Sequence, residues 1–287
     1  MKLSGGYKKS LKSVEVEEIF DLIIYRPLSF FFVKIIYNTN ITPNQISVVS
    51  MFLGIVAGFF YGFADYKFAV LAAALVFAGN TLDCADGQLA RLKKNGTKTG
   101  RVIDGFIDYV MALSVFLGIM FYLQNYFGNL FISFIFAFTA GLSRALQNFY
   151  FDYYRNMYLA VVYNKTQDID SEIKDFKNEK QNLKKVKGKY FDKILIDIYI
   201  FYCNLQKKFS KNTAVKSSPE QYRKTNKIII RIWSWIGSTT HITVLIIFTL
   251  LDKIELYLFL TLGLGNFLMI ILLVISHFVN KKLTPVN

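Results

Sequence analysis

Long apolar stretches alternate with short polar or basic segments along most of the 287-residue chain. A helix needs about 20 mainly apolar residues to cross a bilayer. The stretches that meet this requirement cover residues 46–64, 68–90, 104–123, 130–150, 229–251 and 256–279. We therefore predict an all-α integral membrane protein, a bundle of six transmembrane helices. The first helix is expected to begin at Pro43, because Thr42 and Gln45 can form a capping box there.

The segment before the first span has a different pattern. Residues 14–37 alternate acidic residues, such as Glu17 and Asp21, with bulky apolar ones. This pattern predicts an amphipathic helix in the cytosolic membrane interface, broken at Arg26–Pro27. Residues 1–40 would then form a cytosolic leader with an interfacial helix. An ordinary soluble helix is the alternative.

The basic residues indicate how the spans are oriented. Of the 34 Lys and Arg residues, two lie in the short turns at 65–67, 124–129 and 252–255. Nearly all the others lie in the N-terminal segment, in residues 91–103 and 151–228, and in the tail. The positive-inside rule places these basic segments in the cytosol. We therefore expect both termini in the cytosol, and no cleavable signal peptide.

A basic cytosolic insertion separates the fourth span from the fifth. Residues 152–227 hold 17 Lys and Arg against 9 Asp and Glu. Apolar residues recur at helical spacing in the middle of this insertion, at Phe191, Ile194, Leu195, Ile198 and Tyr202. They could rest on an anionic lipid surface or on a partner helix, and a solvated charged linker is the alternative. On either side of the insertion we expect a four-span core at 41–151 and two further spans with a tail at 228–287.

Composition narrows the class of protein further. Hydrophobic residues make up 53% of the chain and charged residues 19%, which excludes a disordered or collagen-like protein. The net charge of +14 does not indicate nucleic-acid binding, because basic residues in so apolar a chain mark cytoplasmic loops and anionic lipid surfaces. Cys84 and Cys203 do not indicate a disulfide framework. His241 and His277 lie in apolar spans and are interpreted as packing residues.

Three glycines repeat every four residues along the first span: Gly54, Gly58 and Gly62. Small residues at this spacing let another helix approach closely. Packing within the bundle and formation of a homodimer both explain the pattern.

Four carboxylates lie on the second and third spans, close to the basic loop that joins them. Asp83 and Asp86 share a helix face, and Asp104 and Asp108 are i, i+4 neighbours on the next helix. Ionisable residues are costly in a span and therefore suggest a function. Facing pairs of hard anionic oxygens suit Mg²⁺ or Mn²⁺, and no His or Cys cluster offers a softer site. The sequence thus predicts a divalent metal site.

Small and basic residues accompany these carboxylates. Gly87 and Ala90 lie on the face of Asp83 and leave room for a bulky group, and Gly100 allows a close approach of the loop. Arg91 is a planar, fork-shaped donor that suits phosphate. Metal, phosphate and lipid together indicate phosphoryl transfer on a lipid-linked nucleotide.

The whole pattern resembles the signature of the CDP-alcohol phosphatidyltransferases. The run Asp83-x2-Asp86-Gly87-x2-Ala90-Arg91-x8-Gly100-x3-Asp104-x3-Asp108 matches that signature at every defined residue and spacing. The start of the first span, Thr42-Pro43-Asn44, is also similar to the family. The resemblance covers residues from about 40 to 150, and the insertion lies outside it.

The resemblance implies a six-helix bundle, often dimeric, that displaces CMP from a CDP-alcohol, usually CDP-diacylglycerol, with the hydroxyl of a second alcohol. By position, Asp83, Asp86 and Asp104 would ligate a pair of Mg²⁺ or Mn²⁺ ions. Asp108 would be a further ligand and the general base. The residues that would line the CDP site are Gly87, Ala90, Arg91 and Gly100.

The acceptor alcohol is expected to be small and polar. Tyr109 follows the last Asp of the pattern, where synthases of phosphatidylglycerophosphate and phosphatidylinositol phosphate usually have Lys or Arg. Gly105 takes the place of the His that is typical of the diacylglycerol-using choline and ethanolamine phosphotransferases. Arg144 on the fourth span is a candidate for binding an acceptor phosphate, although snorkelling at a helix end also explains it.

Two other functions stay open at this point. One is a choline- or ethanolamine-type phosphotransferase that uses diacylglycerol as the acceptor. The other is a non-catalytic membrane scaffold or carrier that merely binds a cation between the two acidic helix ends. The spacing of the small residues and the arginine favours the enzyme, because a cation carrier would not need them.

Overall fold

A computed structural model describes the chain at residues 3–11, 13–95, 98–163, 173–174, 176–178, 180–181, 193–194, 196–201, 203–204 and 217–283. Side chains of residues 3–5, 8 and 98–104 lie outside the description. Every regular element in the described part is a helix. The chain forms two compact units, residues 1–151 with 231–271, and residues 152–230 with 272–287.

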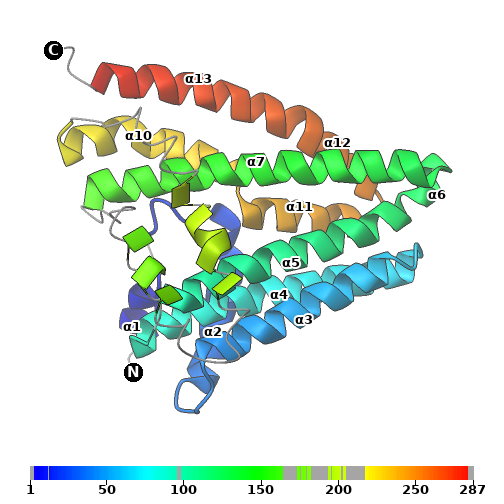
Figure 1. The fold of residues 1–287 in the computed structure, drawn as a ribbon, viewed down its shortest axis with the longest axis horizontal. Coiled ribbons are helices and arrows are strands. Elements are labelled where there is room, and N and C mark those ends of the chain that lie inside the picture. Colours follow the sequence, from blue (N-terminus) through cyan, green and yellow to red (C-terminus); the bar gives the residue numbers. More distant parts are fainter. Residues whose placement is uncertain are drawn as a thin grey trace. The chain divides into compact units, whose positions relative to one another are not determined.

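The helices follow one another with short connections (Figure 1). Up to the insertion they are α1 (Leu3–Ser10), η1 (Asp21–Tyr25), α2 (Arg26–Ile36), α3 (Pro43–Tyr61), α4 (Tyr66–Lys93), α5 (Lys98–Tyr122), α6 (Gln124–Phe127) and α7 (Leu130–Tyr163). After it come α10 (Pro219–Trp233), η2 (Ser234–Ile236), α11 (Ser238–Leu250), α12 (Ile254–Leu260), η3 (Thr261–Gly265) and α13 (Asn266–Leu283). The elements η1 and η3 are π-helical turns, and η2 is a 3₁₀ turn.

Five helical stretches among the described residues are long and apolar enough to cross a membrane: Pro43–Tyr61, Tyr66–Lys93, Gly105–Phe127, Leu130–Tyr163 and Ile254–Leu283. A sixth span results if Pro219–Ile236 and Ser238–Leu250, which are bent by 40° against each other, are counted as one. The prediction of an all-helical, multi-pass membrane protein is therefore confirmed.

Two predicted spans need correction. The stretch at 229–251 is not one straight helix, because the backbone at Gly237 is extended and ends the helical run. Its second part, α11, has 13 residues, which span about 20 Å and fall short of a bilayer core of about 30 Å. In addition, α7 continues to Tyr163, past the predicted end at residue 150. Asp152 and Arg155, paired at 2.8 Å one turn apart, support this extension.

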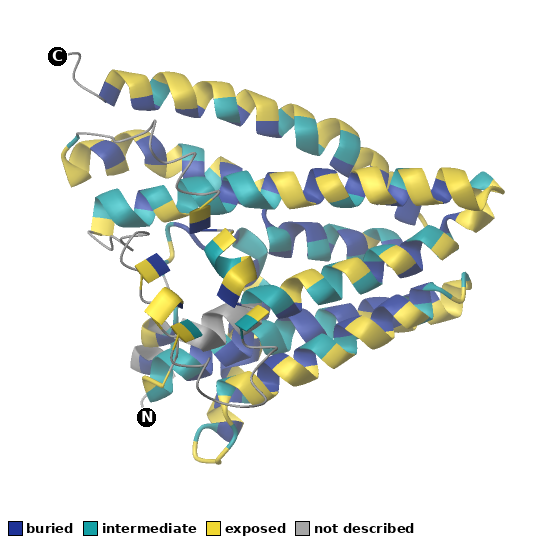
Figure 2. Cartoon of the chain, in the orientation of Figure 1, coloured by how far each residue is buried: buried dark blue, intermediate teal, exposed yellow. Residues whose placement is uncertain are grey.

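The N-terminal segment differs from the prediction in two ways. It is not broken at Arg26–Pro27, because a π-helical turn leads directly into α2 and accommodates the missing N–H of the proline. Acidic side chains also point into the protein, and many apolar side chains point outward. Glu17, Glu18 and Asp21 are buried against the protein, whereas most exposed side chains of the segment are apolar (Figure 2). They include Ile23, Leu28, Phe31 and Ile35, and Lys34 is exposed among them. An outward apolar face suits contact with lipid, so this segment places its acids inside the protein.

The helices α3, α4 and α5 lie side by side in the first unit (Figure 1). The capping box at Thr42 and Gln45 is present, so α3 begins at Pro43 as predicted. Glycines allow the close packing of α3 on α5. A Cβ on Gly54 would overlap the side chain of Met111, and a Cβ on Gly58 would overlap the backbone of Ser114. Packing within the bundle therefore accounts for these two glycines.

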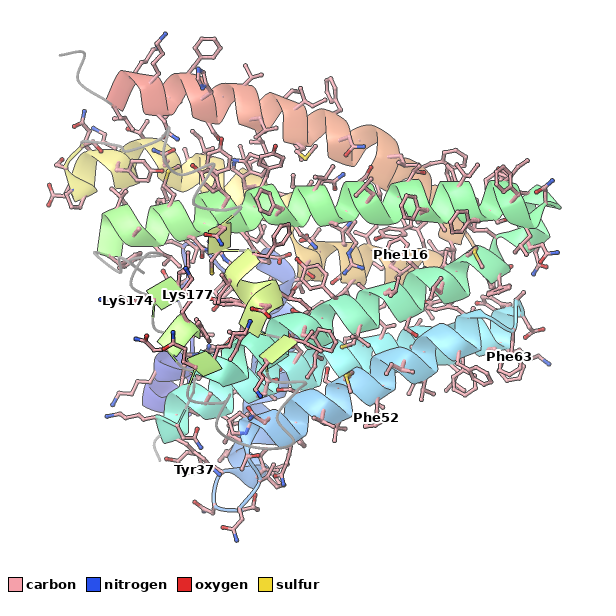
Figure 3. The ribbon with its side chains drawn as sticks, viewed as in Figure 1. Tyr37, Phe52, Phe63, Phe116, Lys174 and Lys177 are labelled. Atoms are coloured by element: carbon pink, nitrogen blue, oxygen red, sulfur yellow. The ribbon has the colours of Figure 1, made fainter. Side chains whose placement is uncertain are left out.

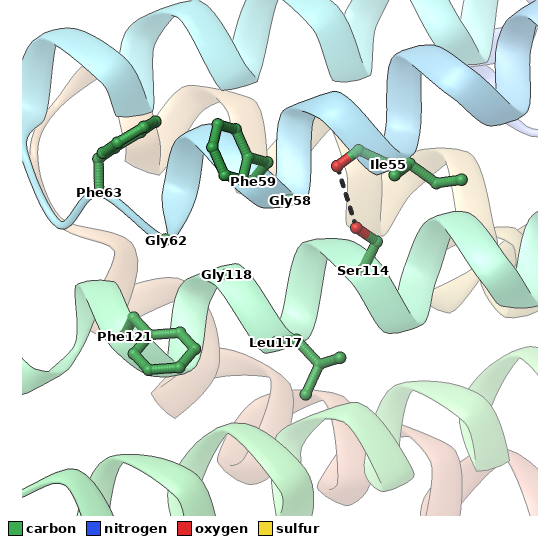
Figure 4. A pocket seen from close by; sticks show the side chains of 9 residues that line it. All are labelled: Ile55, Gly58, Phe59, Gly62, Phe63, Ser114, Leu117, Gly118 and Phe121. Atoms are coloured by element: carbon green, nitrogen blue, oxygen red, sulfur yellow. Dashed lines mark hydrogen bonds between the residues drawn. The ribbon is translucent and has the colours of Figure 1, made fainter.

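A groove of about 430 Å³ lies between α3 and α5, at the part of both helices far from the carboxylates (Figure 4). Its floor contains Gly58 and Gly118, and Phe59, Phe63 and Phe121 contribute aromatic walls. The Ser114 hydroxyl donates to the Ile55 carbonyl oxygen along it, at 3.2 Å. Phe63, just past the end of α3, and Phe52 on α3 are both exposed (Figure 3). The groove is apolar and belongs to the outer surface of the bundle.

Candidate active site

The helix α4 presents Asp83 and Asp86 near its C-terminal end, as predicted. Asp86 is 5% exposed, and its Oδ2 accepts a hydrogen bond of 2.5 Å from the Ser47 hydroxyl on α3. Asp83 is half-buried. The contact with Ser47 fixes one carboxylate of the motif against the first turns of the neighbouring helix. Ser47 could not be predicted from the sequence, because a lone serine at the start of a span carries no signal of its own.

The opposite face of α4 is held by the N-terminal segment. The Ser29 hydroxyl donates to the Thr81 carbonyl oxygen at 2.6 Å, and Arg26 Nη1 donates to the Cys84 carbonyl oxygen at 3.4 Å. In return, the Gln88 amide donates to the Arg26 carbonyl oxygen at 3.0 Å. Thr81, Cys84 and Gln88 recur at i, i+3 and i+7, so they share one side of the helix. These bonds fix the rotation of α4 and turn Asp83 and Asp86 to the other side.

The buried arginine of this segment is charge-paired. Arg26 Nη2 lies 3.1 Å from Glu17 Oε2 and 4.0 Å from Asp21 Oδ2. The Thr239 hydroxyl also donates to Asp21 Oδ1, at 3.1 Å. Burial is the main cause that raises the pKa of the Asp21 carboxyl, while the charge of Arg26 lowers it. Arg26 and its partners therefore hold α2 in place against the helices around it.

A second acid of the segment caps α11. Glu18 Oε2 accepts hydrogen bonds from the backbone N–H of Thr240 at 2.8 Å and from its hydroxyl at 3.0 Å. Glu18 Oε1 accepts from the Thr239 N–H at 3.2 Å. Negative charge at a helix N-terminus is favourable, and Gly237 leaves the space that this carboxylate fills. Burial, together with the nearby charge of Asp21, raises the pKa of Glu18 to about 8.

Arg91 lies beside the carboxylates and folds back over Gly87. A Cβ on Gly87 would come within 3.3 Å of Arg91 Nη1, so the glycine leaves the room that the guanidinium occupies. Arg91 Nε donates to the Ser10 carbonyl oxygen. Its Nη2 is buried and has no hydrogen-bond partner among the described residues. The arrangement leaves a cationic donor available one turn from Asp86. Ala90, between them in sequence, is half-buried.

The structure describes the second acidic pair only in part. The helix α5 begins at Lys98, so Gly100 lies in its first turn and not in a loop as expected. Asp104 belongs to the same helix, but its side chain lies outside the described residues. Asp108 and Tyr109 are exposed, and nothing lies within 4 Å of a Cβ on Gly105. Asp104 and Asp108 remain one turn apart on one helix, as predicted.

Arg144 is buried on α7 in the first unit. It is 7% exposed, its guanidinium carbon lies 5.7 Å from the centroid of the Phe116 ring on α5 (Figure 3), and its Nε has no hydrogen-bond partner among the described residues. Burial at this level speaks against snorkelling to the surface. A buried guanidinium with an unused donor is suited to an anionic ligand.

A polar network lies one turn further along α7. His241 Nε2 lies 2.8 Å from Gln147 Oε1, and the Gln147 amide donates to the Thr261 carbonyl oxygen at 3.0 Å and to Asn266 Oδ1 at 2.9 Å. The Asn266 amide donates to the Ser143 hydroxyl at 3.0 Å. His241 is therefore a hydrogen-bonded packing residue, as interpreted from the sequence. The network ties α7 to α11 and to the π-helical turn η3.

Among the described side chains, no group of three or more His, Cys, Asp or Glu residues stands close enough to hold a metal ion. Asp104, the third predicted ligand, is not among those side chains. The donors that are described, on Asp83 and Asp86, are hard carboxylate oxygens of the kind that Mg²⁺ and Mn²⁺ prefer. The chemistry of this donor set therefore fits a divalent metal.

Comparison with known proteins agrees with this geometry. The family model of the CDP-alcohol phosphatidyltransferases matches residues 40–166, which include α3, α4, α5 and the carboxylates. The matched residues contain Asp83 and Asp86, the described carboxylates of the candidate site, in a chain with five or six candidate membrane spans. Residues 40–166, less than half of the chain, are thus similar to the CDP-alcohol phosphatidyltransferases.

One curated relative is similar over part of this region. It is an archaetidylinositol phosphate synthase from Pyrococcus horikoshii, 29% identical over 86 residues. The similar stretch covers 30% of this chain and 44% of the relative. The chain thus matches less than half the length of that protein.

Proposed function

We propose that this protein transfers a phosphate-linked lipid group from a CDP-alcohol to the hydroxyl of a second alcohol and releases CMP. The observation that carries the proposal is the arrangement around Asp83 and Asp86, both within the matched region. One helix presents the two carboxylates, Ser47 holds Asp86, and Arg91 offers a buried donor one turn away. A scaffold that only bound a cation would not need the arginine or the space at Gly87.

The reaction forms one bond and breaks another at the same phosphorus. The acceptor oxygen bonds to the phosphorus that carries the lipid alcohol, while the bond from that phosphorus to the bridging oxygen breaks, and CMP leaves with that oxygen. Asp108, exposed on α5, is the proposed general base that takes the hydroxyl proton. Positioning and charge stabilisation supply most of the rate in reactions of this type.

The carboxylates would hold a divalent metal, and the other motif residues would bind the nucleotide. Asp83, Asp86 and Asp104, with Asp108 as a further ligand, are the proposed ligands of a pair of Mg²⁺ or Mn²⁺ ions. When bound, these ions supply positive charge that neutralises the pyrophosphate and favours the departure of CMP. Arg91 is proposed to donate to a phosphate of the CDP group.

Small residues leave the space that the nucleotide needs. Gly87 makes room for the guanidinium of Arg91, and Ala90 and Gly100 are proposed to line the rest of the CDP site. CDP-diacylglycerol is the proposed donor, because a lipid-linked nucleotide can keep its acyl chains in the bilayer beside these helices.

The proposed acceptor is a small polar alcohol, in particular a polyol phosphate. The relative from Pyrococcus horikoshii is named for forming archaetidylinositol phosphate, a product with a phosphorylated polyol in its headgroup. Arg144 supports the same class, because its buried guanidinium has an unused donor for a phosphate. A choline- or ethanolamine-type transfer to diacylglycerol is the alternative, and it would need no anion site at Arg144.

Location and partners follow from charge. We propose that the active site, the basic segments and both termini face the cytosol. An anionic lipid surface is the proposed partner of the basic insertion.

Formation of a homodimer also stays a proposal. Gly54 and Gly58 give it no support, since both are used inside one chain.

The decisive experiment measures CMP release and lipid product together. Purified protein is incubated with CDP-diacylglycerol, Mg²⁺ and single alcohols, among them inositol phosphate, glycerol phosphate, inositol and serine. We expect transfer with a polyol phosphate, loss of turnover in Asp83→Asn, and unchanged turnover in Glu220→Gln, a change at an exposed glutamate. Transfer of a headgroup from CDP-choline or CDP-ethanolamine to diacylglycerol would overturn the acceptor. Turnover in Asp83→Asn equal to that of the unaltered protein would overturn the site.

A further inference from the structure

Two helical stretches of the insertion pack on each other within the second unit. The first covers described residues between 173 and 181, and the second covers described residues between 193 and 204. The Phe176 and Tyr199 rings lie 4.8 Å apart, and Phe176 is fully buried. Lys180 Nζ also donates to the Asp197 carboxylate. The second stretch therefore has a defined inner face, which contains Ile196 and Cys203.

The outer face of the second stretch is also apolar. Ile194, Ile198 and Phe201 are 56%, 50% and 65% exposed. They follow one another at i, i+4 and i+7, so they form one stripe along the helix. A soluble helix normally turns charged or polar residues to this side. The sequence left open whether the apolar residues here meet lipid or a partner helix, and the structure shows a second apolar face beyond the one that packs on its partner.

Among the described residues of the two stretches, the charges on and around this stripe are positive or paired. Asp197 is the only acid among the described residues of the second stretch, and Lys180 pairs with it. Lys174 and Lys177 on the first stretch are exposed (Figure 3). The insertion as a whole carries 17 basic against 9 acidic residues. An apolar stripe with basic surroundings is the composition of helices that lie in the interface of anionic membranes.

We propose that Ile194, Ile198 and Phe201 dock the insertion onto the anionic surface of the membrane that the protein itself spans. The insertion is tethered on both sides to membrane helices, which gives the bilayer a high effective concentration at this face. A second protein copy would have to compete with that surface. The inference names the face that meets the lipid, and it does not depend on the proposed reaction.

The test uses the full-length protein in vesicles. A bimane fluorophore is attached at Phe201→Cys, and Asn178→Cys on the first stretch provides a matched exposed, polar position. The native thiols of Cys84 and Cys203 are buried, and the unaltered protein treated in the same way gives the background. Lipids that carry a nitroxide on the acyl chain quench only fluorophores that reach the apolar layer.

We expect strong quenching at position 201 and weak quenching at position 178 in vesicles with anionic lipid. Quenching at 201 should fall when neutral lipid replaces the anionic lipid, and when high salt screens the lysines. Ile198→Cys, one turn away on the same stripe, should behave like Phe201→Cys and serves if the first variant does not fold. Equal quenching at 178, 198 and 201 would overturn the proposal. So would quenching that depends on the protein density in the vesicle, which indicates a second copy as the partner.

Discussion

Ser47 places a hydroxyl against a carboxylate that the sequence marks as a metal ligand. Its hydrogen bond to Asp86 joins residues 39 positions apart, on two different helices. Groups of this kind orient a metal ligand without touching the metal. Ser47 is thus a positioning residue for the proposed site, because it links the start of α3 to the carboxylate of Asp86 on α4.

Removal of this hydroxyl should weaken the response to metal. We expect Ser47→Ala to raise the Mg²⁺ concentration for half-maximal CMP release by about 10-fold, the lower end of the effect of outer-shell partners. Ser47→Thr should restore the response, because it keeps the hydroxyl. Ser50→Ala, one turn further along α3 and bonded to the Gly79 carbonyl oxygen, should leave the metal response unchanged. An unchanged Mg²⁺ requirement in Ser47→Ala would refute the assignment.

The N-terminal segment acts as an element that clamps two helices. Through Arg26 and Ser29 it holds the back of α4, and through Glu18 it caps α11. Periodicity correctly predicted a helix over residues 19–36, but the predicted helix also included residues 14–18, which form turns and irregular backbone. It did not predict which side faces inward, because in a membrane the apolar side can face the lipid and the charged side the protein. The capping contact joins residues 222 positions apart, a separation at which a sequence pattern carries no signal.

Protonation of Glu18 should make stability depend on pH. Its pKa in the folded protein is raised to about 8, above the ordinary value of 4.5. Between these two values the folded state holds a proton that the unfolded state has lost, so stability falls as pH rises from about 4.5 to about 8. We expect Glu18→Gln to reduce the drop in melting temperature between pH 6 and pH 8, measured in detergent. Glu220→Gln, at an exposed position, should keep the full drop, and a Glu18→Gln drop of the same size would contradict this prediction.

The contact between α3 and α5 should tolerate no added atom at Gly118. A Cβ there would overlap the Gly58 carbonyl oxygen, which is backbone and cannot turn aside. We expect Gly118→Ala to destabilise the protein by about 1–3 kcal/mol, as overpacking does. Gly105→Ala on the same helix has open space around the new methyl group and should be neutral or stabilising. Thermal unfolding of the two variants checks this, and equal melting temperatures would show that the helices can separate.

At the scale of the whole molecule, five of the six spans and the helical positions of the motif on α4 and α5 could be predicted because both depend on local signals. Hydropathy marks a span within its own 20 residues, and the motif occupies 26 consecutive residues. The bend of the fifth span could not be predicted. It lies at Gly237, beside the carboxylate of Glu18, and this contact with a distant part of the chain leaves no trace in the local sequence. The same holds for Arg144 on α7, which is buried beside the Phe116 ring of α5.

Orientation in the membrane is the prediction that concerns the whole molecule. Asn95 follows α4 on the side of the basic loop, and Asn125 lies in α6, the short helix between α5 and α7. We expect a membrane-impermeant maleimide added to intact cells to label Asn125→Cys and not Asn95→Cys. Opened cells should label at both positions, which shows that each thiol is reachable. Labelling of Asn95→Cys alone in intact cells would reverse the topology.

The bond between Glu18 and the start of α11 also has a consequence for how the protein is made. The ribosome synthesises Glu18 some 222 residues before Thr240, its partner. At about 5–20 residues per second, many seconds pass between the synthesis of Glu18 and the synthesis of α11, the helix that Glu18 caps. Until then, α4 can insert into the membrane, but the N-terminal segment that holds α4 cannot yet make its contact with α11. The candidate site would therefore reach its final form only late in synthesis, and a ribosome stalled before α11 would hold a chain in which the proposed activity has not yet arisen.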